Sequence, residues 1–204
     1  MNNMQFEHTK RTKVNRTATR SSYDKELFNT IVDEIKFGHI AFSNDSGVHS
    51  IPMLVWRNND YLYFHCSAGS RLAKLAEAQT DICISFATID GYVFAKSAFK
   101  HSVNYRSAVI YGKCELVNDN AEKLETFKKL IELYDKNRWR QVRTPGAEEL
   151  AATALLKLPI VEAVVKVRSG PPVDKEGDKQ LDVWAGVIPY LHQTGAPVQH
   201  LYND

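Results

Sequence analysis

The hydrophobic pattern of residues 39–117 breaks into short runs of β-branched and aromatic residues that are separated by turn signals. We predict strands over 39–43, 48–57, 61–65, 81–88, 92–99 and 106–117. Asn44-Asp45-Ser46-Gly47 joins the first two runs by a hairpin-type connection. Because the runs follow one another at hairpin spacing, with helices between only some of them, the pattern favours a small antiparallel barrel over a doubly wound parallel sheet.

Apolar residues at helical spacing predict helices around these strands, over 23–36, 70–78, 119–135 and 147–156. Ser22 is the predicted N-cap of the first helix, and Asp119 with Glu122 forms a predicted capping box on the third. The remaining predictions are a long strand, a polar loop and a closing segment, over 159–168, 169–181 and 183–190. The expected fold class is mostly β with α, an α+β fold in which helices flank an antiparallel barrel.

The chain is long enough for one domain with an extension at each end. It has 204 residues, of which 44% are hydrophobic, so a full core needs no disulfide or structural metal. We expect a basic N-terminal extension over 1–20, one domain over 21–190 and a C-terminal tail over 191–204. The extension lacks the aromatic and Gly/Arg interleaving of nucleic-acid arms. We therefore interpret it as a segment that packs along its own domain or a dimer partner, with no nucleic-acid role.

The sequence lacks the marks of membrane, secreted and metal-binding proteins. No window approaches 18 apolar residues, and the N-terminus shows no apolar signal-peptide core. Cys66, Cys83 and Cys114 are odd in number and far apart, which fits a reducing cytosol rather than a disulfide framework or a zinc site. The seven histidines show no metal-ligand spacing. We expect a cytoplasmic protein with no membrane contact and no metal site.

The most informative stretch is FHCSAGSRLAKL at residues 64–75, where a predicted strand ends and a helix begins. Free backbone N–H groups and the positive end of the helix dipole make a helix start an anion site. Ser70, Arg71 and Lys74 would add a hydroxyl and two cations there, since positions three apart share a helix face. The alternative is a capped surface helix whose charges are merely solvated.

This stretch resembles the phosphate-binding segment of the pyridoxamine 5′-phosphate oxidase-like flavoproteins, the FMN-binding split barrels. Leu72 stands where that family usually has a lysine, and Lys74 is the candidate replacement. Four further patches follow in the order of one subgroup, the flavin-nucleotide-binding or nitroimidazole-resistance-like proteins. They are NYRS, LAAT, KVRSGPP and VWAGV, at residues 104–107, 150–153, 166–172 and 183–187.

The resemblance implies an antiparallel split β-barrel that binds FMN and works as a homodimer with two sites at the interface. The strand 49–53 would lie along the flavin ring, and Arg106 with Ser107 would approach the phosphate or the ring. The implied cofactor-binding residues are His49, Ser50, Ile51, Pro52, Met53, His65, Cys66, Ser70, Arg71, Lys74, Arg106 and Ser107. For His65 a partly exposed strand-end histidine is an equal alternative, and for Cys66 a small buried residue is the favoured one.

The function implied is that of an oxidoreductase in which reduced FMN passes electrons to a small acceptor such as a nitro-compound. Reduction of free flavin or of a quinone-like acceptor is one alternative. A non-catalytic FMN carrier or sensing module is another. The C-terminal sequence VQHLYND lacks the Arg-Leu-His-Asp-Arg segment of true pyridoxamine 5′-phosphate oxidases, so we expect no oxidation of that substrate. No catalytic residue, substrate or electron donor is indicated.

Overall fold

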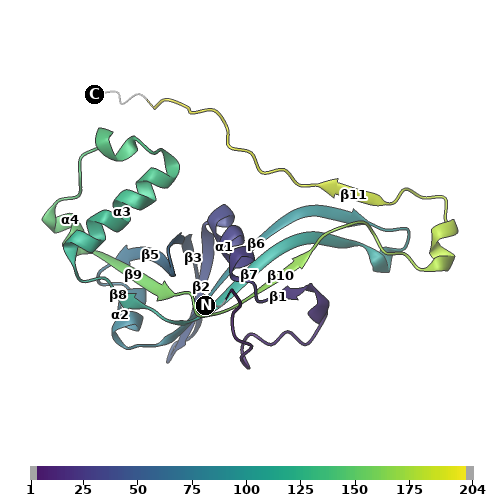
Figure 1. The fold of residues 1–204 in the computed structure, drawn as a ribbon, viewed down its shortest axis with the longest axis horizontal. Coiled ribbons are helices and arrows are strands. Elements are labelled where there is room, and N and C mark those ends of the chain that lie inside the picture. Colours follow the sequence, from purple (N-terminus) through teal and green to yellow (C-terminus); the bar gives the residue numbers. More distant parts are fainter. Residues whose placement is uncertain (1–3, 201–204) are drawn as a thin grey trace. The chain divides into compact units, whose positions relative to one another are not determined.

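The computed structural model describes residues 4–200 (Figure 1). These residues divide into two units. The first unit comprises residues 4–88 and 106–167, and the second comprises residues 89–105 and 168–200. Strands β6 (Asp81–Phe94) and β7 (Ser102–Lys113) each continue from one unit into the other. The division into these two units does not test the predicted domain boundaries at residues 20 and 190, which stay a prediction.

Two antiparallel sheets build the first unit. The strands of the larger sheet have the order β1-β10-β7-β6-β2-β3. Besides β6 and β7, these are β1 (Ser21–Ser22), β2 (Phe37–Asn44), β3 (Gly47–Leu54) and β10 (Glu162–Arg168). The smaller has the order β4-β5-β9-β8, with strands Trp56–Asn58, Tyr61–Ser67, Thr153–Pro159 and Glu115–Leu116 in that order. β2 pairs antiparallel with both β3 and β6, and β5 with both β4 and β9. The prediction of antiparallel hairpins is confirmed.

The helices form where apolar spacing predicted them, but two of the caps differ. α1 (Lys25–Ile35) is capped by Asp24, whose carboxylate accepts from the backbone N–H of Leu27 at 2.7 Å, so the prediction of Ser22 is wrong. α3 (Asn120–Tyr134) is capped by Asp119 alone. Glu122 accepts a hydrogen bond from Lys157 instead of closing a capping box. α2 (Arg71–Glu77) has Ser70 as its N-cap.

Several element boundaries differ from the prediction because strand pairing outweighs local pattern. The predicted strand 159–168 is two strands, since β9 ends at Pro159 and β10 begins at Glu162. The predicted strand 106–117 begins earlier, at Ser102, and breaks at Cys114 between β7 and β8. β6 is one strand of 14 residues where two were predicted, since β11 (Gly186–Pro189) pairs across its residues 91–94. Helix α4 (Ala147–Ala152) stops four residues earlier than predicted. Residues 153–156 belong to β9 instead, opposite residues 64–67 of β5. The predicted run 48–57 breaks at the buried Val55 into β3 and β4.

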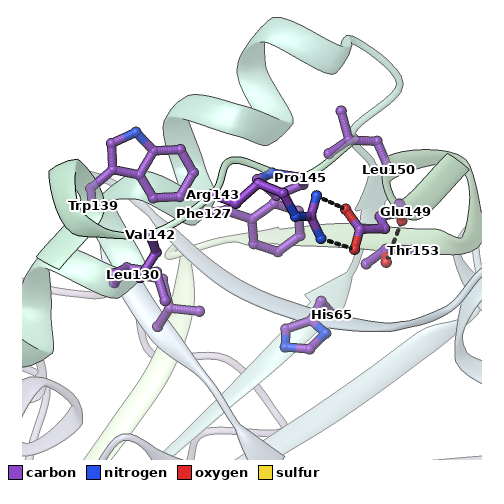
Figure 2. Close-up of a pocket in the computed structure, with 11 residues that line it drawn as sticks. His65, Phe127, Leu130, Trp139, Val142, Arg143, Pro145, Glu149, Leu150 and Thr153 are labelled. Atoms are coloured by element: carbon purple, nitrogen blue, oxygen red, sulfur yellow. Dashed lines mark hydrogen bonds and ion pairs between the residues drawn. The ribbon is translucent and has the colours of Figure 1, made fainter. Parts of the chain in front are cut away.

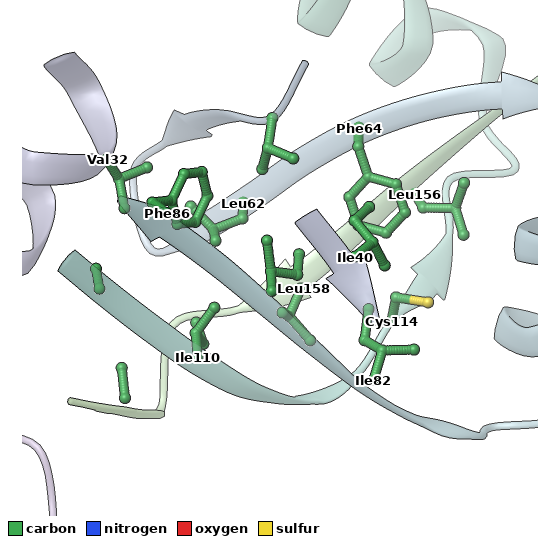
Figure 3. Packing of buried hydrophobic residues seen from close by; sticks show 14 of the residues in the cluster. Val32, Ile40, Leu62, Phe64, Ile82, Phe86, Ile110, Cys114, Leu156 and Leu158 are labelled. Atoms are coloured by element: carbon green, nitrogen blue, oxygen red, sulfur yellow. The ribbon is translucent and has the colours of Figure 1, made fainter. Parts of the chain in front are cut away.

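The main core lies in the first unit, between the two sheets and α1. Figure 3 shows Val32 of α1 together with buried side chains of β2, β5, β6, β7 and β9. A second cluster joins the smaller sheet to α3 and consists of Trp56, Tyr63, Val117, Leu130 and Leu155. This second cluster fixes α3 over the strand that carries His65.

The basic N-terminal segment lies against the first unit. Phe6 and Thr12 are buried, and the Tyr23 hydroxyl donates to the carbonyl oxygen of Thr12 at 2.8 Å. Arg11 pairs with Asp81 at 3.0 Å and with Glu162 of β10. The interpretation as a segment that packs along its own domain agrees with these contacts.

The second unit consists of the outer ends of β6 and β7, strand β11, and two single 3₁₀ turns, Ala98–Lys100 and Glu176–Gln180. Two further 3₁₀ turns, Ala18–Arg20 and Arg138–Gln141, belong to the first unit. Among the described hydrophobic residues of the second unit, only Val93 and Ala95 are buried. Arg168 is buried as well, and donates to Asn104 and to the carbonyl oxygens of Gly170 and Pro171.

Candidate functional site

Arg71, the first residue of α2, is held by a histidine of the β2–β3 hairpin. Its guanidinium donates to Nδ1 of His49 at 3.0 Å. Because Nδ1 accepts, the hydrogen lies on Nε2, which donates to Oδ1 of Asn44 at 3.0 Å. The His49 ring also stacks on Phe42, with ring centroids 4.9 Å apart. This chain of contacts orients an exposed guanidinium beside the entry to the helix.

Arg71 has no acidic partner among residues 4–200, unlike two other arginines that lie on strands of the first unit. Arg57 pairs with Asp33, and Arg106 pairs with Glu34. Within residues 4–200 no carboxylate forms an ion pair with Arg71 or with Lys74, one helical turn further on. Leu72, at the family's usual lysine position, is buried in the core. Two cations with no acidic partner there suit a phosphate group.

Ser70 and Cys66 contact each other at the start of α2. The Ser70 hydroxyl donates to the Cys66 sulfur at 3.0 Å and accepts from the backbone N–H of Ala73 at 3.3 Å. Burial raises the pKa of the Cys66 thiol, and the hydrogen bond from Ser70 offsets only part of that rise. A neutral, packed thiol fits the structural role expected for Cys66 rather than a nucleophile.

The strand predicted to lie along the flavin ring is β3, the last strand in the order of the larger sheet. Ile51 and Met53 pack against the core, whereas Ser50 and Pro52 are exposed. Pro52, opposite His39 of β2, has no N–H to donate, which suits an edge strand. His49 is the residue of this strand that the structure brings to Arg71.

Arg106 and Ser107 make other contacts. The Arg106 guanidinium forms two hydrogen bonds to the Glu34 carboxylate of α1. The Ser107 hydroxyl donates to the carbonyl oxygen of Lys166 in β10 at 3.2 Å. These two predicted residues therefore tie β7 to its neighbours in the structure, and their role toward a cofactor stays a prediction.

His65 opens into a different cavity, of about 380 Å³, between β5 and the segment that runs from α3 to α4 (Figure 2). The wall is mostly apolar and consists of Phe127, Leu130, Ile131, Trp139, Val142, Pro145 and Leu150, with Arg143, Glu149 and Thr153 as its polar members besides His65. Successive residues of a strand point to opposite faces, so His65 and Cys66 diverge. The structure thus separates His65 from the Arg71 group.

The His65 imidazole has aromatic neighbours and no polar partner among residues 4–200. Its ring centroid lies 5.8 Å from that of Phe127 and 6.2 Å from that of Trp56. The surrounding protein lowers the pKa of His65, because burial disfavours the charged form. A lowered pKa favours the neutral imidazole, and a ring nitrogen without a hydrogen-bond partner among residues 4–200 faces the cavity. Such a group is a ligand for transition metals.

An ion pair lies across the cavity from His65 (Figure 2). Arg143 makes two hydrogen bonds to the Glu149 carboxylate, at 2.8 and 2.7 Å. Their side chains are 74% and 52% exposed, so the pair is solvent-screened and weak. Glu149 also accepts from the backbone N–H of Gly146 at 2.7 Å, which caps α4.

Sequence reasoning identified His65 but missed the rest of this cavity. Trp139 comes from the 3₁₀ turn Arg138–Gln141, Arg143 from the irregular segment after it and Glu149 from α4, and no hydrophobic period marks a face that they share. The LAAT patch, which contains Leu150 and Thr153, was a sign of relatedness and gave no hint of a cavity wall. A metal cluster of three or more His, Cys, Asp or Glu side chains is absent from residues 4–200. No helix within that range combines the length and the apolar character needed to cross a membrane.

Comparison with known proteins places the chain among flavin-associated folds. The family model described as pyridoxamine 5′-phosphate oxidase matches residues 24–167. The flavocytochrome Anf3 from Azotobacter vinelandii is 36% identical with a TM-score of 0.90, and the match covers 96% of this chain and 91% of that one. An FAD and heme binding protein from Mycobacterium smegmatis is 31% identical with a TM-score of 0.83, covering 89% of each chain.

A more distant structure, a proposed 5-nitroimidazole antibiotic resistance protein from Bacteroides thetaiotaomicron, has the same fold. It is 20% identical with a TM-score of 0.60, and the match covers 72% of this chain and 86% of that one. A comparison with curated protein sequences finds no match.

Proposed function

This chain belongs to the pyridoxamine 5′-phosphate oxidase family, and from that premise we propose that it binds a flavin and a heme. The predicted family and the predicted α+β split-barrel fold are confirmed. The main support for this proposal is that two relatives, at 36% and 31% identity, are a flavocytochrome and an FAD and heme binding protein.

The proposed flavin site is the group around Arg71. Arg71 and Lys74 lack acidic partners among the described residues, and His49 orients the guanidinium. A planar guanidinium binds phosphate through two parallel hydrogen bonds, which an ammonium does not. FMN and FAD both carry a phosphate on the ribityl chain, so this group serves either one. The sequence predicts FMN, and the Mycobacterium smegmatis relative favours FAD.

The proposed activity is electron transfer to a small acceptor. When bound, the flavin supplies two-electron chemistry and the heme one-electron chemistry. The protein's residues bind and orient both groups. A nitro-compound as acceptor, free-flavin reduction and a non-catalytic carrier or sensing role remain the finer alternatives. Oxidation of pyridoxamine 5′-phosphate lies outside the proposal, as the sequence predicts.

We also propose that the protein works as a homodimer, as the family resemblance implies. The support is the exposed apolar surface of the second unit, which includes Phe99, Trp184, Ile188 and Tyr190. Surfaces of this kind are covered in most soluble proteins. A second copy of the chain is the proposed cover. That each flavin lies at a dimer interface is what the family resemblance implies.

The test is the absorbance spectrum of protein purified without added cofactor, followed by chromatography of the released groups. We expect oxidised-flavin bands and a Soret band, and the released flavin is then identified as FMN or FAD. Flavin without heme would remove the flavocytochrome part of the proposal. If neither group is present and neither binds on addition at tens of micromolar, on the order of −6 kcal/mol, the proposed function is wrong.

A further inference from the structure

We infer that the cavity between β5 and the α3–α4 segment is the heme site, with His65 as an axial ligand of the iron and Arg143 as the partner of a propionate. This inference rests on the proposed function, because it assigns a place to the heme that the function requires. It uses the side chains of the first unit alone.

The chemistry of the wall fits an iron porphyrin. A porphyrin is flat and apolar over most of its surface, and carries its anionic propionates along one edge. The cavity offers Phe127, Leu130, Trp139 and Val142 as apolar surface. Its volume of about 380 Å³ falls within the range of cofactor sites, roughly 300–1,000 Å³. The ring of His65 opens into it from β5.

The iron ligand follows from the donor atoms of the lining. Protein-bound heme iron takes a histidine nitrogen, a thiolate, a thioether or a phenolate as its usual axial ligand. His65 is the one residue of these types in the lining. Its ring nitrogens have no hydrogen-bond partner among residues 4–200, so ligation breaks no existing contact. Glu149, the carboxylate of the lining, is already engaged by Arg143 and Gly146.

The Arg143–Glu149 pair supplies the anion contact. Both side chains are more than half exposed, so exchanging one carboxylate partner for another costs little. A propionate would replace Glu149 on Arg143 by the same two-pronged hydrogen bonding. Glu149 keeps its hydrogen bond from Gly146, so α4 stays capped after the exchange.

A flavin is the competing occupant of this cavity. The flavin ring is also flat. Its phosphate would bind better at Arg71, which has no acidic partner within the described residues, than at Arg143, which is paired with Glu149. A flavin also makes no use of a free imidazole nitrogen as a metal ligand. The donor set of the cavity therefore favours the iron porphyrin, and the experiment below separates the two.

The test is a titration of heme-free protein with hemin, followed by the Soret band and its stoichiometry. We expect wild type to bind one heme per chain with the spectrum of a histidine-ligated iron. His65→Ala should lose that spectrum and weaken binding by at least tenfold, and free imidazole should restore the spectrum. The matched control is His39→Ala, which removes another exposed strand histidine outside the cavity lining and should bind as wild type does.

Two further variants keep the inference testable if His65→Ala folds poorly. His65→Gln has a side chain of similar size but offers no imidazole. It should fold as wild type does and lose the histidine-ligated spectrum. Arg143→Ala should weaken hemin binding about tenfold while leaving that spectrum unchanged. Glu149→Gln, which removes the competing carboxylate, should bind hemin at least as tightly as wild type.

The outcomes distinguish the inference from the function on which it rests. If wild type binds heme and His65→Gln keeps the same spectrum and affinity, the site assignment is wrong and the flavocytochrome proposal stands. If wild type binds no heme while FMN or FAD still binds, the heme part of the function fails and takes the inference with it. Displacement of bound flavin by hemin at equal stoichiometry would contradict the separate-site assignment.

Discussion

The two units of this chain are stabilised in different ways. The first has an apolar core built from two sheets and a helix, with Phe28, Ile40, Phe64 and Leu156 at or near zero exposure. The second holds its buried Arg168 in a set of polar contacts, while most of its large apolar side chains face outward. A unit that exposes its apolar side chains and buries an arginine depends on something else to cover it.

The contrast assigns different roles to the two units. Both candidate cofactor sites, the Arg71 group and the His65 cavity, lie on elements of the first unit, whose packing holds side chains in place. The exposed side chains of the second unit have the composition of an interface core, with Trp184, Tyr92 and Tyr190 among them. We therefore expect mutations in the first unit to change folding and cofactor binding directly, and mutations in the second to act first on association.

The largest expected difference between the units comes from the same type of substitution, phenylalanine to alanine, made at one position in each unit. Phe64→Ala removes a fully buried ring from the first unit and should lower the free energy of unfolding by about 3–5 kcal/mol. Phe99→Ala removes a ring that is 91% exposed in the second unit and should change it by less than about 0.5 kcal/mol. Urea unfolding measures both. Similar losses for the two variants would break the comparison.

A smaller effect is expected for the polar contacts that stabilise the second unit. Arg168→Met should lower local stability by about 2–4 kcal/mol, since Asn104 and two backbone carbonyls lose a charged donor. Amide hydrogen exchange should speed up over 89–105 and leave the first unit unchanged. The control is Lys175→Met, at an exposed lysine of the same unit. Unchanged exchange over 89–105 would mean that these contacts do not hold the unit.

The smallest effect concerns association. The proposed dimer has a mass of about 46 kDa, twice the chain's 23.1 kDa. Ile188→Asp, in β11 opposite Tyr92, should weaken it at least tenfold, or about 1.4 kcal/mol. Val161→Asp places the same charge at an exposed valine of the first unit and should leave the dimer intact. Light scattering across a dilution series decides. A wild-type monomer that still binds flavin would contradict the shared-site proposal.

Local patterns were enough to predict much of the first unit. The stripe through Phe28, Ile31 and Val32 predicts α1, and the Asn44–Gly47 turn predicts the β2–β3 hairpin. Ser70 predicts the start of α2. These features depend on neighbours in sequence, so a single chain is sufficient to find them. The five ordered patches likewise identified the family.

Features that depend on distant pairing were missed. Residues 153–156 have a helical pattern of their own but pair with β5, and tertiary context decides. The His65 cavity joins β5 to residues 127–153, which begin more than 60 residues further along the chain. The sequence predicts no metal site because ligand spacing reveals only sites built from several clustered side chains. A heme needs only one protein side chain, since the porphyrin supplies the other ligands, and ligand spacing carries no signal for it.

The central claim is that the first unit binds a flavin through its phosphate at Arg71, and one comparison of ligands tests it. Arg71→Ala should weaken FMN and FAD binding by about 10- to 150-fold, for a charged hydrogen bond of roughly 1.5–3 kcal/mol. Riboflavin has the same ring without a phosphate, so its binding should barely change. Arg71→Lys should lose part of the effect. Flavin fluorescence titrations of wild type and Arg71→Ala give these values. Equal losses for FMN and riboflavin, or no loss for FMN, would contradict the claim.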